Sequence, residues 1–297
     1  MDLPDGLIER ALVLPDAASV AAVMAAQELV DAGQVMVEEA DIVADWQRPS
    51  FDLAASTVGA FEGERLVAYA ELSANGAGDA AVHPDYRGRG IGSALARWMQ
   101  ERARLTGVVT VGLSTPAGSP GATLMADLGY RVRWTSWVLR LPADQTITSQ
   151  PVPDGYALRL AEPNDYRAVH AVIEDAFSEW SGRARESYED FAASVYERPG
   201  FEPWHVCVAS APVGAIVGAV WLLMDREQCF VAKLAVQRDH RHRGLARALL
   251  ADAFARGREH GAAVCELTTD SRTGALGLYE KLGMVVTSTW LNYAIEP

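Results

Sequence analysis

Two short stretches of this sequence combine arginine and glycine in a way that suits anion binding. Residues 86–92 read YRGRGIG and residues 240–246 read HRHRGLA, and each is followed by a helix-like segment. Glycine lets backbone N–H groups converge without a Cβ atom in the way, and the first turn of a helix offers unpaired N–H groups. Arginine adds charge suited to phosphate. Each stretch therefore predicts a phosphate or pyrophosphate cradle.

The glycine spacing excludes two other phosphate-binding motifs. Ser93 stands where a dinucleotide fingerprint requires its third glycine, and the Gly-Lys-Ser/Thr of a P-loop is missing. A helix entry after a tight turn, with its arginines exposed, is the alternative explanation of a single copy. Two copies at the same place in two repeats argue against that alternative.

The chain contains an internal repeat. A shift of 154 residues carries the first stretch onto the second and Leu128-Gly129 onto Leu282-Gly283. A shift of 149 residues carries the PDG at 4–6 onto the PDG at 153–155. These matches indicate two domains of one plan, at residues 1–143 and 151–297, joined by a linker near 142–152 that is rich in Pro, Ser and Thr.

The pattern of apolar residues predicts the elements that position the second cradle. Strands are expected at 156–161, 204–209, 215–224, 229–236, 263–269 and 285–295, and helices at 164–178, 186–197, 244–259 and 274–282. This mixed order predicts an α/β or α+β fold in which helices flank one sheet.

Composition narrows the classes of function. The 297 residues are 49% hydrophobic and carry a net charge of −13, with acidic residues in excess in both halves. This balance argues against a nucleic-acid-binding surface. An acidic surface is typical of plain solubility and would also suit a cationic substrate. No apolar run is long enough to span a membrane and no signal core is present, so a cytoplasmic location is expected. Cys207, Cys229 and Cys265 match no metal pattern and are interpreted as buried thiols, and no metal is expected.

The cradle residues resemble a known family. The pattern Arg-x-x-Gly-x-Gly/Ala between a strand and a helix is similar to the acyl-CoA pyrophosphate motif of the GNAT N-acyltransferase superfamily. A second motif of that superfamily is matched by ALGLYEKLGM at residues 275–284, with Met284 in place of Phe. The tandem layout resembles mycothiol synthase and related actinobacterial acetyltransferases. The resemblance implies two tandem GNAT domains, each with a mixed, splayed central β-sheet flanked by helices.

The resemblance also implies a cofactor, acetyl-CoA, and a set of residues that bind it. The pantetheine arm would pair with the free edge of a splayed strand, and the pyrophosphate would lie on the cradle. In the second domain the matching residues are Leu234, Ala235, Val236, Arg241, His242, Arg243, Gly244, Leu245, Ala246 and Arg247. In the first domain they are Ala81, Val82, Arg87, Gly88, Arg89, Gly90, Ile91, Gly92 and Ser93.

The same resemblance suggests catalytic residues. Tyr279 occupies the position of the general acid that protonates the leaving thiolate, while the first domain has Met125 there. The first domain is therefore expected to be catalytically degenerate. Phe230 stands where many relatives have a glutamate base, which leaves Glu227 as the proposed base. Asp225, Glu179, His205 and His170 remain alternatives.

These observations predict an N-acetyltransferase that acts on a primary amine of a small molecule by direct attack. Two alternatives stay open: a non-catalytic acyl-CoA-binding or sensing protein, and an N-acetyltransferase acting on proteins. The expected partners are the amine alone, with no nucleic acid and no membrane, and the expected state is a monomer or homodimer. The sequence leaves open the acceptor, which could be a mycothiol precursor, an antibiotic amine or an amino acid, and also the acyl chain length.

Overall fold

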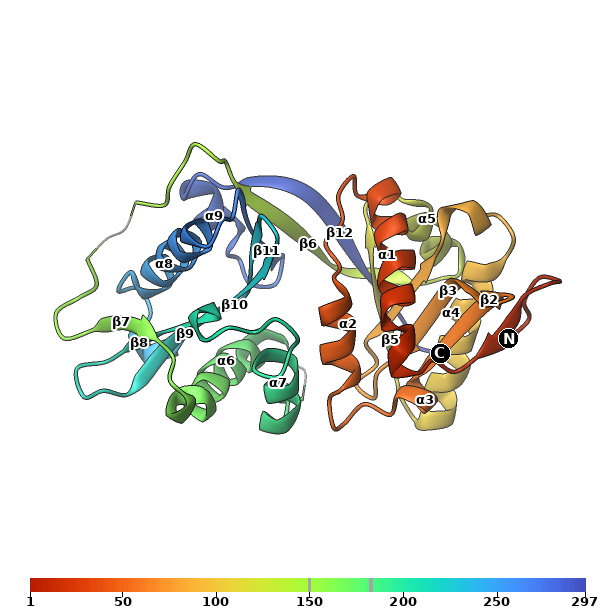
Figure 1. Ribbon diagram of the computed structural model, residues 1–297, viewed down its shortest axis with the longest axis horizontal. Helices are drawn as coiled ribbons and strands as arrows, with labels where there is room; N and C mark the ends of the chain where they lie inside the picture. Colours follow the sequence, from red (N-terminus) through yellow and green to blue (C-terminus); the bar gives the residue numbers. More distant parts are fainter. Residues whose placement is uncertain (149–150, 182–183) are drawn as a thin grey trace. The chain divides into compact units, whose positions relative to one another are not determined.

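The computed structural model describes residues 1–148, 151–181 and 184–297; residues 149–150, within the predicted linker, lie outside the description. Contacts divide the chain into two compact units. Unit 1 comprises Met1–Thr135, Ala192–Pro199 and Thr289–Pro297, and unit 2 comprises Ser136–Phe191 and Gly200–Ser288. Each unit is a mixed sheet flanked by helices, as the resemblance implies (Figure 1).

Unit 1 is built around an antiparallel sheet of order β1-β2-β3-β4. Its strands are β1 (Ile8–Arg10), β2 (Thr57–Glu62), β3 (Arg65–Leu72), β4 (Gly78–Val82) and β5 (Val111–Pro116). Its helices are α1 (Ala17–Asp31), α2 (Glu39–Trp46), α3 (Leu53–Ser56), α4 (Ile91–Thr106) and α5 (Pro120–Asp127). A single parallel bridge, between Ala77 and Gly112, links the start of β4 to β5.

The two faces of β3 pack against different helices, because side chains alternate along a strand. Ala68 and Ala70 share a core with Leu95 of α4. Tyr69, between them, shares another core with Val20 of α1. The sheet thereby holds α1 and α4 on opposite faces, and both helices border the end of β4.

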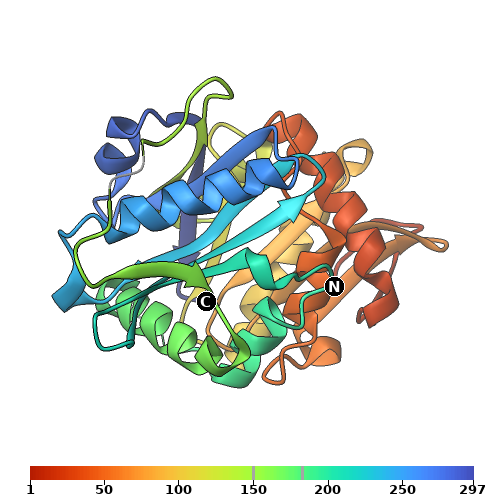
Figure 2. The ribbon, with the colours of Figure 1, turned by 60° about the vertical axis from the view of Figure 1, so that its left-hand side comes forward.

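Unit 2 repeats this arrangement. Its strands are β7 (Ala157–Leu160), β8 (Val206–Ser210), β9 (Ile216–Asp225), β10 (Gln228–Val236) and β11 (Val264–Asp270). Its helices are α6 (Tyr166–Ser181), α8 (Leu245–Glu259) and α9 (Leu276–Lys281). Helix α7 (Tyr188–Val195) begins in unit 2 and ends in unit 1. Figure 2 shows α8 lying along the strands, and Figure 1 shows α6 on their other side.

Two long strands contribute segments to both units. The second part of β6 (Arg131–Leu141) pairs with β11 in unit 2, from Ser136 to Leu141. The second part of β12 (Val285–Ile295) pairs with β5 in unit 1, from Trp290 to Ile295. The predicted boundary between 143 and 151 follows the sequence repeat. In the compact units, however, residues 136–141 of the first repeat belong to unit 2, and residues 289–297 of the second repeat belong to unit 1.

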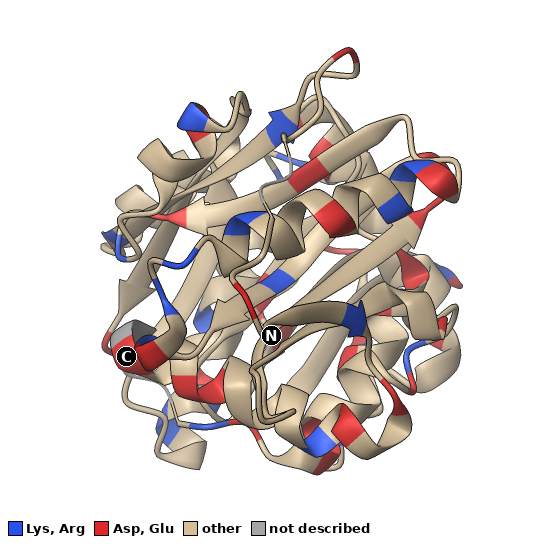
Figure 3. Ribbon diagram, turned by 90° about the vertical axis from the view of Figure 1, so that its left-hand side faces the viewer, with Lys and Arg blue, Asp and Glu red and all other residues tan. Residues whose placement is uncertain are grey.

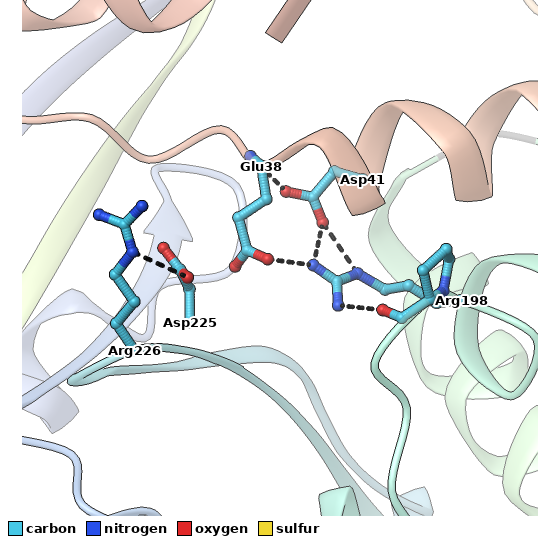
Figure 4. A network of polar contacts seen from close by, with 6 residues as sticks. Glu38, Asp41, Arg198, Asp225 and Arg226 are labelled. Atoms are coloured by element: carbon cyan, nitrogen blue, oxygen red, sulfur yellow. Dashed lines mark hydrogen bonds and ion pairs between the residues drawn. The ribbon is translucent and has the colours of Figure 1, made fainter. Parts of the chain in front are cut away.

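A buried arginine holds residues 192–199 in unit 1. The side chain of Arg198 is only 5% exposed, and its guanidinium lies 2.9 Å from Asp41 and 3.0 Å from Glu38 (Figure 4). Its Nη1 also donates to the carbonyl of Pro199. A buried cation needs such partners, because removing a charge from water is costly.

Figure 3 shows acidic and basic residues interspersed along the ribbon. Within residues 1–148, 151–181 and 184–297, no helix is both long enough and apolar enough to cross a bilayer. The three cysteines are buried and unpaired by disulfides, as expected.

We expect Arg198→Ala to lower the free energy of unfolding by about 2–4 kcal/mol, because it leaves two partly buried carboxylates without their cation. Urea denaturation of the full chain measures this. Arg185→Ala is the matched control: Arg185 pairs with Asp175, but both side chains are 52% exposed, so a loss within about 0.5 kcal/mol is expected. Equal losses in the two variants would contradict the structural role of Arg198.

Candidate active site

The central feature of unit 2 is the point where two neighbouring strands part. The parallel strands β10 and β11 pair only from Gln228 to Val231 on β10. Beyond Val231, β10 continues along β9 after a register shift between Val231 and Lys233. A shift of this kind is a bulge, which bends a strand away from its former neighbour. The outer edge of residues 232–236 is therefore left without a partner strand.

A cavity of about 350 Å³ lies where the strands part. Residues 242–247 of the cradle are not in its lining, but five of the second-domain residues expected at the site are. They are Leu234, Ala235 and Val236 on the strand edge, Arg241 in the following loop, and Tyr279 on α9. Residues from α6 and from the end of β11 complete the lining: Ala176, Phe177, Thr268, Thr269, Asp270, Arg272 and Thr273.

The edge of β10 offers backbone donors to this cavity. The N–H of Gln237 donates to the carbonyl of Val217 on β9. Because successive N–H groups of a strand point to opposite sides, those of Val236 and Leu234 point away from β9, toward the splay. Within the described residues no side chain accepts from either group, so both donors are available to a ligand.

Both predicted cradles have the backbone shape that the sequence indicated. In unit 2, His242 and Gly244 have φ values of 60° and 80°, and α8 begins directly afterwards. In unit 1, Gly88 and Gly90 have φ values of 74° and 85°, and α4 begins directly afterwards. Each helix thus presents the unpaired N–H groups of its first turn at the end of a left-handed loop.

The first arginine of each cradle is engaged by a carboxylate. Arg241 forms two bonds of 2.8 and 2.9 Å with Glu179 and donates from Nε to the carbonyl of Val236. Arg87 forms two bonds of 2.8 Å with Asp31, whose side chain is only 4% exposed. In both units this arginine ties the loop to the end of a helix. Its phosphate-binding role stays a prediction.

The second arginine of each cradle is exposed and faces an aromatic ring. Arg89 lies 4.8 Å from the ring centre of Tyr86, and Arg243 lies 5.9 Å from that of Tyr156. These two side chains, rather than Arg87 and Arg241, are the cations most accessible to an anion at the helix terminus.

Tyr279 has the protonation state that a proton donor needs. It belongs to α9, lines the cavity together with Leu234, and burial raises its pKa above the usual value of 10. The phenol therefore stays protonated at neutral pH. Its counterpart in unit 1 is Met125, a buried residue that lines a separate cavity of about 340 Å³. The thioether of Met125 has no proton to donate.

The structure does not bring Glu227 to the cavity. Glu227 is exposed in the turn between β9 and β10, and Leu234 lies seven residues further on, roughly 23 Å along an extended strand. Its carbonyl accepts from Ala263 and Val264. Asp225 ends β9 beside the same turn. The predicted base role of Glu227 thus has no support from this geometry.

The other candidate bases, Glu179, His170 and His205, are hydrogen-bonded to groups outside the cavity lining or to Arg241. Glu179 is held by Arg241, which lowers the pKa of its carboxyl and keeps it ionised. The ring of His170 contacts the carbonyl of Glu186, and the ring of His205 contacts the N–H of Glu202. None of these three side chains is among those that line the cavity.

Sequence reasoning missed the carboxylate that does line the cavity. Asp270 is buried at the end of β11 and bonds the guanidinium of Arg272 at 2.6 and 3.2 Å. Its counterpart under the 154-residue shift is Pro116, so the repeat gave no signal for it.

Unit 1 contains a second cavity, of about 390 Å³, and Gln27 lines both this cavity and the cradle cavity. Four carboxylates line it: Glu28, Asp45, Glu71 and Asp79. Burial, and then repulsion by Asp79, raises the pKa of Glu71 to about 7, although Trp46 donates to it at 2.9 Å. Burial also raises the pKa of Asp79 and of Glu28.

Comparison with known proteins gives the same picture of two repeats. The family model described as "Acetyltransferase (GNAT) family" matches residues 24–130 and 167–284. A mycothiol acetyltransferase of Salinispora arenicola is 34% identical over 241 residues, which cover 77% of each chain. Its counterpart from Salinispora tropica is 32% identical, over 77% of this chain and 78% of the relative.

Two solved structures share the whole architecture. A GCN5-related N-acetyltransferase from Sphaerobacter thermophilus has a TM-score of 0.77 and 28% identity, covering 99% of this chain and 96% of that chain. A tandem GNAT protein from the clavulanic acid biosynthesis pathway has a TM-score of 0.76 and 20% identity, covering 98% of both chains. The second likeness concerns the fold alone.

The raised pKa of Glu71 predicts how stability depends on pH. A carboxyl whose pKa rises from 4.5 to about 7 on folding stabilises the fold in its neutral form, and this stability is lost as the pH rises through 7. We expect Glu71→Gln to raise the free energy of unfolding by about 2–3 kcal/mol over that of the wild type at pH 8, and to leave it unchanged at pH 4. Urea denaturation at both pH values tests this.

The matched control is Glu64→Gln, which alters an exposed carboxyl of the same unit. It should leave the free energy of unfolding unchanged at both pH values. A gain for Glu71→Gln that is the same at pH 4 and pH 8 would contradict the prediction, because it could not come from titration.

Proposed function

Because this chain belongs to the acetyltransferase (GNAT) family and carries the family domain twice, we propose that it transfers an acetyl group from acetyl-CoA to a primary amine of a small molecule. One observation carries the proposal: in unit 2, the edge residues Leu234 and Val236, Arg241 at the start of the cradle and the protonated Tyr279 line one cavity. The relatives named mycothiol acetyltransferase support a small-molecule acceptor.

The residues of unit 2 fit the shape and charge of acyl-CoA. The backbone N–H groups of 242–246 at the start of α8 suit the pyrophosphate, with Arg243 exposed beside them. The edge of Leu234, Ala235 and Val236 can pair with the amides of an extended pantetheine arm, as in strand addition. When bound, acetyl-CoA supplies an acetyl group activated as a thioester.

Two groups of the protein assist the transfer. The N–H of Leu234 points into the splay, where it can donate to a carbonyl oxygen on which negative charge develops. Tyr279 can donate its proton to the sulfur that leaves as the C–N bond forms and the C–S bond breaks. Direct attack by the amine needs no covalent enzyme intermediate, and holding both reactants in one cavity supplies much of the rate.

The proposal also covers the charge of the substrate, the role of unit 1, the location and the oligomeric state. The net charge of −13 favours approach of a protonated amine. In unit 1, the cradle of residues 87–93 with Ala81 and Val82 is proposed to bind the nucleotide end of acyl-CoA, without transfer, since Met125 replaces the tyrosine. We place the activity in the cytoplasm, and a monomer or homodimer stays the prediction.

The test is Tyr279→Phe, which removes one proton donor and keeps the ring. We expect kcat to fall by roughly 10²-fold with a small change in the KM for acetyl-CoA, because the hydroxyl acts in the transition state. Because burial raises the pKa of Tyr279, this group should cause no decline of the wild-type rate between pH 7 and 9. Thiol release from acetyl-CoA with a panel of small primary amines measures both.

Tyr130→Phe is the control, since Tyr130 is a buried tyrosine of unit 1. It should leave kcat unchanged. CoA binding without turnover of any amine would support the sensing alternative instead, and turnover confined to peptide amines would support a protein acetyltransferase. An unchanged kcat in Tyr279→Phe would exclude the acid role.

A further inference from the structure

The structure shows which residues of the two repeats correspond. The pair Arg10–Asp16 at the start of α1 recurs as Arg159–Asp165 at the start of α6, which fixes the helices at a shift of 149 residues. Gln27 of α1 therefore corresponds to Ala176 of α6. The strands before the cradles correspond at a shift of 154 residues, so Asp79 and Val82 correspond to Lys233 and Val236.

In unit 1 the chain itself satisfies the donors on the edge of β4. The N–H of His83 donates to Val67 on β3, so those of Val82 and Ala80 point away from β3, toward the splay. The Val82 N–H donates to Oε1 of Gln27 at 2.9 Å. The Ala80 N–H donates to Oδ1 of Asp79 at 2.8 Å.

In unit 2 the corresponding side chains cannot do this. Ala176 has no acceptor and lies in the lining of the cavity. Lys233 is a donor only, and its Nζ lies 5.5 Å from the centre of the Phe177 ring. In the part of the chain that the structure describes, no side chain accepts from the N–H groups of Leu234 and Val236, although strand, helix and cradle recur in both units.

We propose that Gln27 and Asp79 close the edge of β4 to an acyl-CoA arm, and that the pair Gln27/Ala176 determines which unit binds CoA tightly. An amide of the ligand would have to displace the Gln27 oxygen from Val82. A thioester oxygen near Ala80 would in addition meet the carboxylate of Asp79 instead of a free donor. The inference deepens the proposed function and rests on it.

The consequence is that each chain has one tight CoA site, in unit 2, and a weaker or absent one in unit 1. This asymmetry is separate from the loss of the tyrosine at Met125, because it concerns binding rather than proton donation. Gln27 is thus a specificity-determining residue for the ligand, and its removal should open the edge of β4.

The experiment is isothermal titration of the full chain with CoA, which needs no turnover. We expect one tight site in the wild type, a second in Gln27→Ala with at least tenfold higher affinity than the wild-type unit 1, and a loss of at least tenfold at unit 2 in Ala176→Gln. The double variant should again show one tight site, now in unit 1. Ala171→Gln, on α6 but outside the cavity lining, should bind like the wild type.

Amide hydrogen exchange locates each site. On addition of CoA, a peptide containing Val236 should gain protection in the wild type, and one containing Val82 only in the Gln27→Ala variants. Two equally tight sites in the wild type, or no change of either site in Gln27→Ala, would overturn the inference. An absence of CoA binding at any site in the wild type would instead overturn the proposed function, so the two failures are distinguishable. Thermal unfolding checks that each variant is folded.

Discussion

The constraint on which both units depend is the unpaired edge created where a strand parts from its neighbour. A backbone N–H that has lost its partner strand must bond to something else, since leaving it buried and unpaired costs free energy. In unit 1 the partners are side chains, from Gln27 and Asp79. In unit 2 no side chain of the described residues takes this place, so the edge can accept an extended ligand. The same backbone arrangement therefore gives a closed edge in unit 1 and an open edge in unit 2. The side chains at two positions, Gln27/Ala176 and Asp79/Lys233, make the difference.

The loops that follow these edges depend on a second constraint. The arginine that begins each cradle forms a bidentate pair with a carboxylate near the end of the preceding helix, at Asp31 in one unit and Glu179 in the other. Such a pair fixes geometry as well as charge. The cradle itself is made of backbone at left-handed positions, including His242 where unit 1 has Gly88. The arginine thus holds the loop in place, and the helix terminus remains as the proposed anion site.

Local patterns in the sequence predicted the elements well but gave no prediction of which strands pair. The expected helix at 244–259 and strand at 285–295 match α8 and β12 almost residue for residue, because apolar period and flanking glycines are local signals. That β12 completes the sheet of unit 1 is a long-range choice between two equivalent partners, which a repeat cannot show. A motif surrounds Tyr279, so the sequence could single out this residue of the cavity lining, and its role as the acid stays a prediction. Glu227 was chosen for its chemistry alone, and the length of β10 separates it from the cavity.

Gln27 and Asp79 carried no sequence signal for a different reason: their effect depends on which way alternate N–H groups point. The same register also bears on the proposal that unit 1 binds acyl-CoA without transfer. Asp79 pairs across the sheet with Glu71, whereas the corresponding Lys233 pairs with Trp221. Two neighbouring carboxyls, partly buried, favour sharing a proton and oppose any further negative charge nearby. A thioester carbonyl that gains negative charge would be repelled there, while a lysine at the same register position adds no such repulsion. Under the proposed function, unit 1 can therefore keep its fold and its cradle while the chemistry takes place in unit 2.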